Sequence, residues 1–181
     1  NAADGKLLMN LGRHSNAVNS AIYSPDGNQI VTTSRDSTAK IWSVGTPSEK
    51  AADGKLLTEL KGHSGWVNSA AYSPDGKYIV TASFDTSFVY SAIFSPDGKN
   101  IATTCEDEIL RIWNAADGEL IAETAGNFQS AAYSPDGKYL VTAFLDMAKI
   151  WEVSTGELFG ELKGRASFFF SALYSPDGRS L

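Results

Sequence analysis

The sequence lacks long apolar stretches, and it has few of the residues on which disulfide frameworks and metal sites depend. Its 181 residues include one cysteine and two histidines. Cys105 has no intrachain partner, and it lies in the strand-like run 101–105, where a buried, inert thiol is expected. No apolar run approaches the ~20 residues that a transmembrane helix needs. The sequence therefore predicts neither a disulfide scaffold nor a helical membrane span.

Clustered positive charge is missing as well. The chain carries 15 Lys and Arg against 21 Asp and Glu, and its basic residues are scattered singly. Because nucleic-acid binders need a basic patch to neutralise phosphates, no nucleic acid partner is expected. Leucine-rich helical stretches are also absent, whereas Val, Ile, Thr, Tyr and Phe gather in short runs that favour β-strands.

What the sequence has in abundance is the tetrapeptide Ser-Pro-Asp-Gly, which occurs five times. Proline pre-sets φ, aspartate tolerates the next position and glycine takes the positive φ that follows, so each copy suits a type I β-turn. Apolar runs flank these turns, which predicts a β-hairpin at each of the first four. The copies are Ser24–Gly27, Ser73–Gly76, Ser95–Gly98, Ser134–Gly137 and Ser175–Gly178.

The spacing of these turns indicates a repeat of about forty residues. From serine to serine the intervals are 49, 22, 39 and 41 residues. The short interval predicts that about half a repeat is omitted or deleted after Ser87, where the chain enters 88–94. The expected strands are 6–11, 17–23, 29–34, 38–43, 55–60, 66–72, 78–83, 88–94, 100–105, 109–113, 119–123, 128–133, 139–144, 148–151, 157–162 and 168–174.

Three further marks recur in register with the turns: Gly62-His63, an aspartate turn, and an Ile-Trp pair that closes a strand, as in Ile41-Trp42. With these marks the chain resembles the WD-repeat β-propeller family over nearly its whole length, and its Asp-Gly turns resemble those of bacterial members. The resemblance implies an all-β propeller of four-stranded antiparallel blades, four to five of them here, within a ring of about seven. The units are 5–43, 55–87 (truncated), 88–114 (truncated at its start), 119–153 and 157–181 (truncated).

The resemblance also implies a hydrogen-bond network in each blade, joining a histidine, a strand serine or threonine, the turn aspartate and a tryptophan. Only the first unit offers all four, and the tryptophans are expected at equivalent, buried positions. The candidates are His14, Thr32 or Ser34, Asp36 and Trp42 in the first unit; His63, Thr81 or Ser83, and Asp85 in the second; Asp107 with Trp113; and Asp146 with Trp151. In the fifth unit Arg165 occupies the histidine position.

In members of the family, residues at the entry of the innermost strand and before the turn aspartate tend to face binding partners. Six of these positions hold large aromatics, a composition typical of interaction hot spots. Packing between blades is the alternative role, and it stays open, above all for Phe168 and Phe170. The candidates for the partner face are Trp66, Asn68, Phe84, Phe88, Tyr90, Arg35, Glu106, Gln129, Phe168 and Phe170, with Ala17, Asn19, Asn127 and Leu145 at the remaining positions.

No catalytic or ligand-binding motif is present: there is no nucleophile elbow, phosphate-cradling glycine loop or paired-carboxylate constellation. His14 and His63 recur at equivalent positions without a third ligand, so they do not predict a zinc site. No catalytic, cofactor-binding or metal-binding residue is assigned, and no cofactor is expected.

The sequence thus predicts a non-catalytic platform that binds a protein or peptide through one face of a propeller, alone or as a subunit of a larger assembly. One alternative is a docking or sensory part of a larger multidomain protein. Another is a propeller enzyme with an active site in its central funnel, which would need converging ionisable residues on the inner strands. Those strands offer Ser, Ala, Asn, Gln and aromatics instead. The compartment stays open, with the cytoplasm favoured.

Overall fold

The computed structural model is built of β-strands and turns. It describes residues 7, 10–44, 54–85, 88–126, 128–144, 146–164 and 171–180, with residue 144 described by its backbone alone, and this part of the chain contains no helix. Several predictions fall outside the described residues, namely those on Ser87, Asn127, Leu145, Arg165, Phe168 and Phe170. Strands are also expected at the two ends of the chain, at 6–11 and 168–174. The residues of these two segments that the structure describes are not in strands.

The described residues form fourteen strands, which match the other expected strands to within a few residues. They are β1 (Val18–Tyr23), β2 (Gln29–Ser34), β3 (Ala39–Ser43), β4 (Leu56–Leu60), β5 (Val67–Tyr72), β6 (Ile79–Ser83), β7 (Val89–Phe94), β8 (Asn100–Cys105), β9 (Ile109–Asn114), β10 (Leu120–Ala125), β11 (Ser130–Tyr133), β12 (Tyr139–Phe144), β13 (Met147–Glu152) and β14 (Leu158–Lys163).

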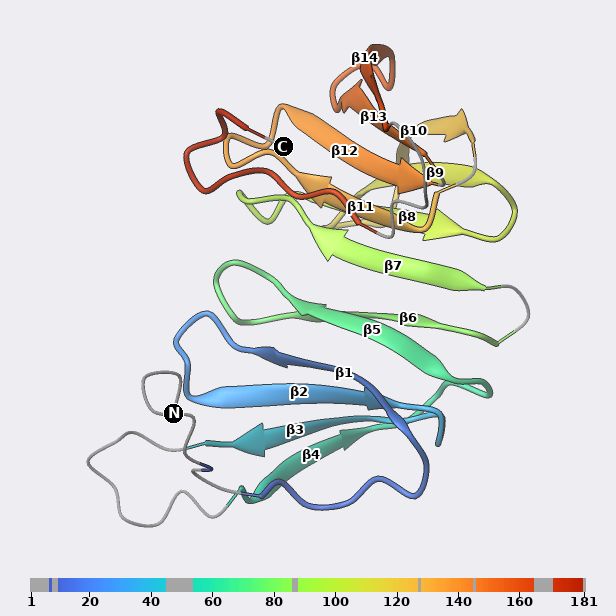
Figure 1. Ribbon diagram of the computed structural model, residues 1–181. Coiled ribbons are helices and arrows are strands. Elements are labelled where there is room, and N and C mark those ends of the chain that lie inside the picture. Colours follow the sequence, from blue (N-terminus) through green and yellow to red (C-terminus); the bar gives the residue numbers. More distant parts are fainter. Residues whose placement is uncertain are drawn as a thin grey trace.

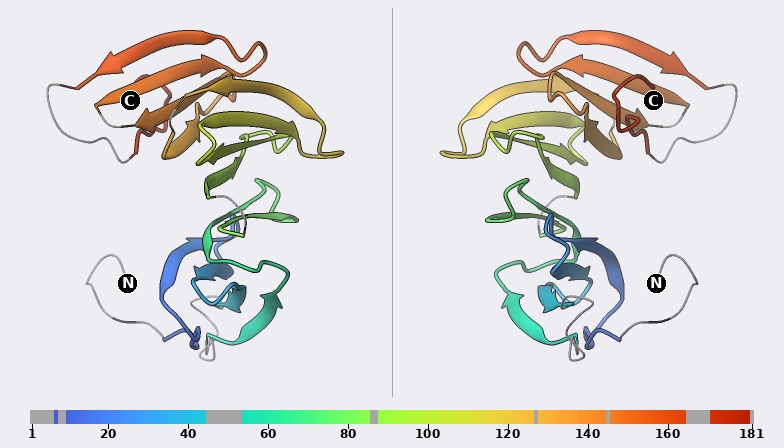
Figure 2. Two further views of the ribbon diagram at one scale, coloured as in Figure 1. Left: turned by 90° about the vertical axis from the view of Figure 1, so that its right-hand side faces the viewer. Right: turned by 90° about the vertical axis from the view of Figure 1, so that its left-hand side faces the viewer.

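These strands form three four-stranded sheets and one two-stranded sheet, all antiparallel between neighbours. In chain order the sheets are β1–β4, β5–β6, β7–β10 and β11–β14. The expected all-β architecture of four-stranded antiparallel blades is confirmed. The sheets follow one another from the β1 end to the β14 end without closing into a ring (Figures 1 and 2).

Each four-stranded sheet takes its last strand from the start of the following sequence unit. Strand β4 lies at the beginning of unit 55–87, but it pairs with β3, where Lys40 faces Glu59. In the same way β14 follows unit 119–153 in the chain and pairs with β13. A sheet is therefore offset by one strand from the repeat in the sequence, which ties consecutive repeats together.

The Ser-Pro-Asp-Gly turns all have one geometry. In the first copy the Ser24 hydroxyl donates to Asp26 Oδ1 at 2.6 Å and accepts the Gln29 N–H at 3.0 Å. The Gly27 N–H donates to Ser24 O at 2.9 Å, and Gly27 has φ of +72°. The other four copies repeat the Ser–Asp bond, the Gly–Ser bond and the positive φ.

Successive turns also pack against one another. A methyl group built on Gly98 would lie 3.4 Å from Cδ of Pro74 in the preceding turn. The same contact recurs between Gly137 and Pro96 at 3.5 Å and between Gly178 and Pro135 at 3.4 Å. The turns therefore form a continuous row along one edge of the sheets, at the left of Figure 1.

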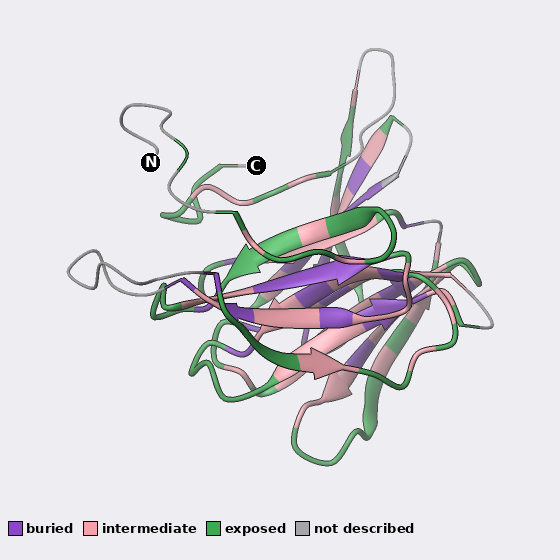
Figure 3. Ribbon diagram, turned by 90° about the horizontal axis from the view of Figure 1, so that it is seen from below, coloured by how far each residue is buried: buried purple, intermediate pink, exposed green. Residues whose placement is uncertain are grey.

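Two apolar clusters hold neighbouring sheets together. The first joins Val31 and Ala39 of the first sheet to Val67 and Ala70 of β5. The larger cluster joins the third and fourth sheets through Leu110, Ile112, Phe128, Leu140 and Trp151, among others. Figure 3 shows the buried stretches within the strands and the exposed ones mainly in the turns and loops.

Candidate functional site

A histidine-centred network stabilises the first sheet. His14 Nδ1 lies 2.9 Å from Asp36 Oδ2, and its Nε2 lies 2.7 Å from Thr32 Oγ1. The same Thr32 hydroxyl accepts the indole N–H of Trp42 at 2.8 Å. Of the two hydroxyls considered from the sequence, Thr32 is therefore the one that joins the histidine to the tryptophan. Ser34 bonds instead to Asn16 O and the Asp36 N–H.

The second sheet has the same network without its tryptophan. His63 Nδ1 lies 2.7 Å from Asp85 Oδ2, and His63 Nε2 lies 2.8 Å from Thr81 Oγ1. The side chains of His14 and Asp36 are 2% and 6% exposed, whereas those of His63 and Asp85 are 30% and 36% exposed. The missing tryptophan thus leaves the second network open to solvent.

The pKa values of the two turn aspartates, Asp36 and Asp85, lie well below the usual range because both accept several hydrogen bonds. Burial alone would raise the pKa of Asp36, but hydrogen bonds from Thr38, His14 and Ser15 outweigh it and hold the pKa well below its usual range. For Asp85, the hydrogen bond from His63 and the backbone N–H of Gly65 lower the pKa most. Both groups are carboxylates at neutral pH, which suits a structural acceptor rather than a proton donor.

The third and fourth sheets keep only the tryptophan–threonine bond. Trp113 Nε1 donates to Thr103 Oγ1, and Trp151 Nε1 donates to Thr142 Oγ1, both at 2.9 Å. Trp42 and Trp151 are buried, whereas Trp113 is only partly buried. These two threonines were not singled out from the sequence, although each is equivalent in register to Thr32.

The two remaining turn aspartates do not contact their tryptophans. Asp107 instead forms an ion pair with Arg111 at 2.7 Å. Asp146 is exposed, and its backbone carbonyl accepts the Gly164 N–H. Among the described residues, no hydrogen bond connects either aspartate to its tryptophan, unlike the network that the resemblance implies.

Five of the partner-face candidates form a continuous row of contacts. The Arg35 guanidinium carbon lies 4.5 Å from the ring centroid of Trp66. The Trp66 and Phe84 rings are 5.7 Å apart between centroids, Phe84 meets Phe88 edge-on, and Phe88 stacks on Tyr90 at 5.9 Å. We call Trp66, Phe84, Phe88 and Tyr90 the aromatic strip. It lies where β5 and β7 begin, at the edge of the sheets opposite the Ser-Pro-Asp-Gly turns (Figure 1).

Three of the polar residues bond to the backbone of neighbouring strands, and Gln129 does not contact the strip in the described residues. Asn19 donates to Val67 O at 2.9 Å, and Asn68 donates to Val89 O at 3.2 Å, so both amides tie neighbouring sheets together. Glu106 is exposed and accepts the Phe88 N–H at 3.4 Å. Gln129 is exposed beside β11, away from the rings of the strip.

No group of three His, Cys, Asp or Glu side chains among the described residues is placed to hold a metal ion. Cys105, expected to be buried, is partly exposed in β8. Where the chain is described, no helix is long and apolar enough to cross a membrane.

The row of antiparallel sheets, the offset of sheet from repeat and the Trp–Thr bonds define a repeat protein built of propeller blades. The family model described as WD domain, G-beta repeat matches residues 5–43, 54–88 and 86–114, more than half of the chain. The chain belongs to the WD-repeat family. The fourth sheet lies beyond the matched residues, yet it repeats the topology and the Trp–Thr bond of the first and third sheets. No curated protein matches the chain.

Proposed function

We propose that this chain is a non-catalytic platform that binds an extended polypeptide through the aromatic strip. WD repeats generally mediate protein–protein interactions, and domains built from them are typically non-catalytic. The observation that carries the proposal is the unbroken row of contacts from Arg35 through Trp66 to Tyr90. Rows of aromatic rings flanked by arginine are typical of binding hot spots.

Exposure supports a binding role for both ends of the strip. Trp66 and Tyr90 are 44% and 38% exposed, although the rings between them are partly covered. An apolar surface of this kind is seldom left open to water without a partner. Arg35 at one end and Glu106 near the other provide charges of opposite sign, so a bound peptide has a defined direction.

The proposal predicts that Trp66→Ala weakens binding of a protein or peptide ligand by about 2 kcal/mol or more while leaving the fold nearly intact. A displayed peptide library selected on the wild-type chain supplies the ligand, and titration calorimetry measures its affinity. Thermal melting of each variant reports on the fold.

Tyr23→Ala is the matched control, because Tyr23 is a similarly exposed aromatic at the far end of β1. It should leave the affinity unchanged. Unchanged binding by Trp66→Ala together with a large fall in melting temperature would mean that Trp66 is a core residue, and the proposal would fail.

A further inference from the structure

The two-stranded sheet leaves one strand edge open in the middle of the molecule. In the complete sheets the second strand pairs on both sides, as β2 does with β1 and β3. In the described residues β6 pairs with β5 alone. Its outer backbone N–H and C=O groups are therefore available to another strand.

The complete sheets define what a third strand on β6 would look like. In each of them a tryptophan faces an aliphatic residue of the second strand, as Trp42 faces Ile30. An isoleucine precedes the tryptophan, and a lysine or arginine before it faces the threonine of the network, as Lys40 faces Thr32. The other two sheets repeat this register with 111–113 and 149–151. On β6 the facing residues would be Ile79, Val80 and Thr81.

The second sheet keeps the hydroxyl acceptor and the histidine that contact a tryptophan in the first sheet. Thr32, Thr103 and Thr142 each accept an indole N–H, whereas the equivalent Thr81 hydroxyl, among the described residues, is bonded to His63 and to no indole. The His63 side chain is 30% exposed, while its counterpart His14, which meets Trp42 edge-on, is 2% exposed. An indole seated on β6 would cover this pair, as Trp42 does in the first sheet.

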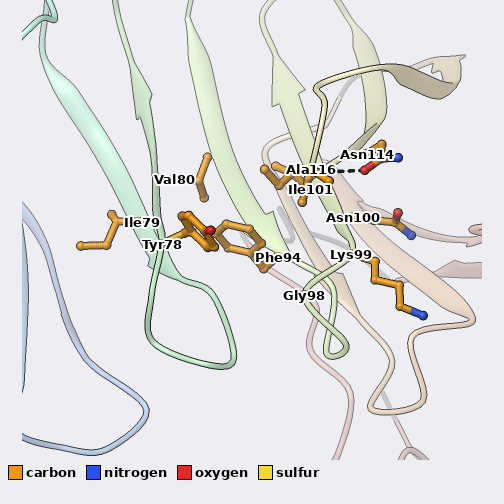
Figure 4. A pocket seen from close by; sticks show the side chains of 11 residues that line it. Tyr78, Ile79, Val80, Phe94, Gly98, Lys99, Asn100, Ile101, Asn114 and Ala116 are labelled. Carbon is orange, nitrogen blue, oxygen red and sulfur yellow. Dashed lines mark hydrogen bonds between the residues drawn. The ribbon is translucent and has the colours of Figure 1, made fainter.

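A cleft of about 810 Å³ lies beside the open edge, between β6 and the third sheet. Tyr78 and Val80 line it on the β6 side, and Phe94 and Ile101 line it from β7 and β8. Figure 4 shows Val80 on the side of β6 that faces the third sheet and Ile79 on the other side. Between the third and fourth sheets, which are both four-stranded, the corresponding space is filled by residues of the third strand of the third sheet. There Leu110 and Ile112 pack against Leu140 and Trp151.

In each complete sheet the basic residue of the third strand has an acidic partner. Lys40, Arg111 and Lys149 pair with the fourth-strand residues Glu59, Glu123 and Glu161. Arg111 also pairs with the turn carboxylate Asp107 at 2.7 Å. Asp85 is the corresponding turn carboxylate of the second sheet, and it is 36% exposed. A lysine or arginine opposite Thr81 would take the position that Arg111 has opposite Thr103, on the face of the sheet from which Arg111 reaches its turn carboxylate.

We propose that the outer edge of β6 binds an extended segment of another protein, with the sequence basic residue–Ile–Trp, as an antiparallel third strand. The described third strands of a second copy of this chain cannot supply the segment, because β3, β9 and β13 are each already paired on both sides. This site is separate from the aromatic strip, so it does not rest on the function proposed above.

The test uses the full 181-residue chain and a capped peptide of residues 37–43, Ser-Thr-Ala-Lys-Ile-Trp-Ser, which contains strand β3 of the first sheet. Titration calorimetry measures affinity, and hydrogen exchange by NMR locates the bound peptide. We expect saturable binding and slower exchange of the Ile79 and Thr81 amides. Replacing the peptide's tryptophan by alanine should weaken binding at least about tenfold, because a buried indole is lost. Replacing its lysine by proline should do the same, because a ladder hydrogen bond is lost.

Two protein variants complete the design. Thr81→Val should weaken binding about fivefold by removing the acceptor for the indole N–H. Trp66→Ala, in the aromatic strip, should bind the peptide as the wild type does, which separates this site from the proposed function. Absence of slower exchange in β6 at millimolar peptide, or equal affinity for the three peptides, would overturn the inference.

Discussion

At the scale of single residues, the tryptophans of the third strands differ in how well neighbouring sheets cover them. Trp151 packs in the cluster between the third and fourth sheets, with Leu110 and Ile112 against it. Trp113 makes the same bond to its threonine but faces the side where the second sheet lacks its outer strands. The environment of the side chain, not its residue type, therefore sets its contribution to stability.

Truncating these tryptophans should consequently have unequal effects. We expect Trp151→Ala to lower the free energy of unfolding by about 3–5 kcal/mol, as for other buried aromatics, and Trp113→Ala to lower it by at least about 1 kcal/mol less. Urea unfolding followed by circular dichroism measures both. Trp66→Ala serves as the exposed control, and an equal or larger loss for Trp113→Ala would contradict the assignment.

Residue types at fixed spacing predicted much of the network but not all of its bonds. His14, Asp36 and Trp42 follow from their positions in the repeat, and they meet through Thr32. The choice of Thr32 over Ser34 could not be made from the sequence, because residues two apart in a strand point to the same face of the sheet. Only the structure shows which of the two hydroxyls reaches the histidine and the tryptophan. The partial exposure of Trp113 was missed because it depends on the neighbouring second sheet, which has only two strands in the described residues.

At the scale of elements, the Ser-Pro-Asp-Gly turn is a self-contained unit whose serine is buried in four of the five copies. Ser95 is 2% exposed, and its hydroxyl donates to Asp97 Oδ1 at 2.7 Å and accepts the Asn100 N–H at 2.9 Å. The serine thus joins both ends of the turn. The same serine–aspartate pair in all five copies explains why the sequence predicted the hairpins so closely.

Ser95→Ala should destabilise the chain by about 1–2 kcal/mol, because it leaves a turn N–H and a carboxylate without their hydroxyl partner. The melting temperature from differential scanning calorimetry measures the effect. Ser154→Ala, at an exposed serine between β13 and β14, should change it little. If both variants have the melting temperature of the wild type, the buried hydroxyl does not stabilise the turn.

At the scale of the whole molecule, each sheet rests only on its neighbours, so stability is local rather than shared by a closed ring. The second sheet is the weakest place, because β6 is paired on one side only. Strand spacing predicted the loss of half a repeat here. The offset of sheets from repeats was not predicted, because hydrophobic periodicity marks strands but does not say which neighbour each strand joins.

Hydrogen exchange should reveal this unevenness at equivalent positions. Val80 and Val141 occupy the same place in β6 and β12, but Val141 is fully buried in a strand paired on both sides. We expect the Val80 amide to exchange at least about tenfold faster than that of Val141, because less structure must open to expose it. Equal rates would indicate that the sheets open together as one cooperative unit.

The row of packed turns has a consequence for how such chains change in length. The contact of Gly98 with Pro74 is kept although the sheet behind Pro74 has only two strands. The turn of the two-stranded sheet thus keeps its place in the row without a third or fourth strand behind it in the described residues. We therefore expect such arrays to tolerate duplication or loss of a single hairpin, about half a repeat, as well as of a whole blade, and each loss to create a new strand edge.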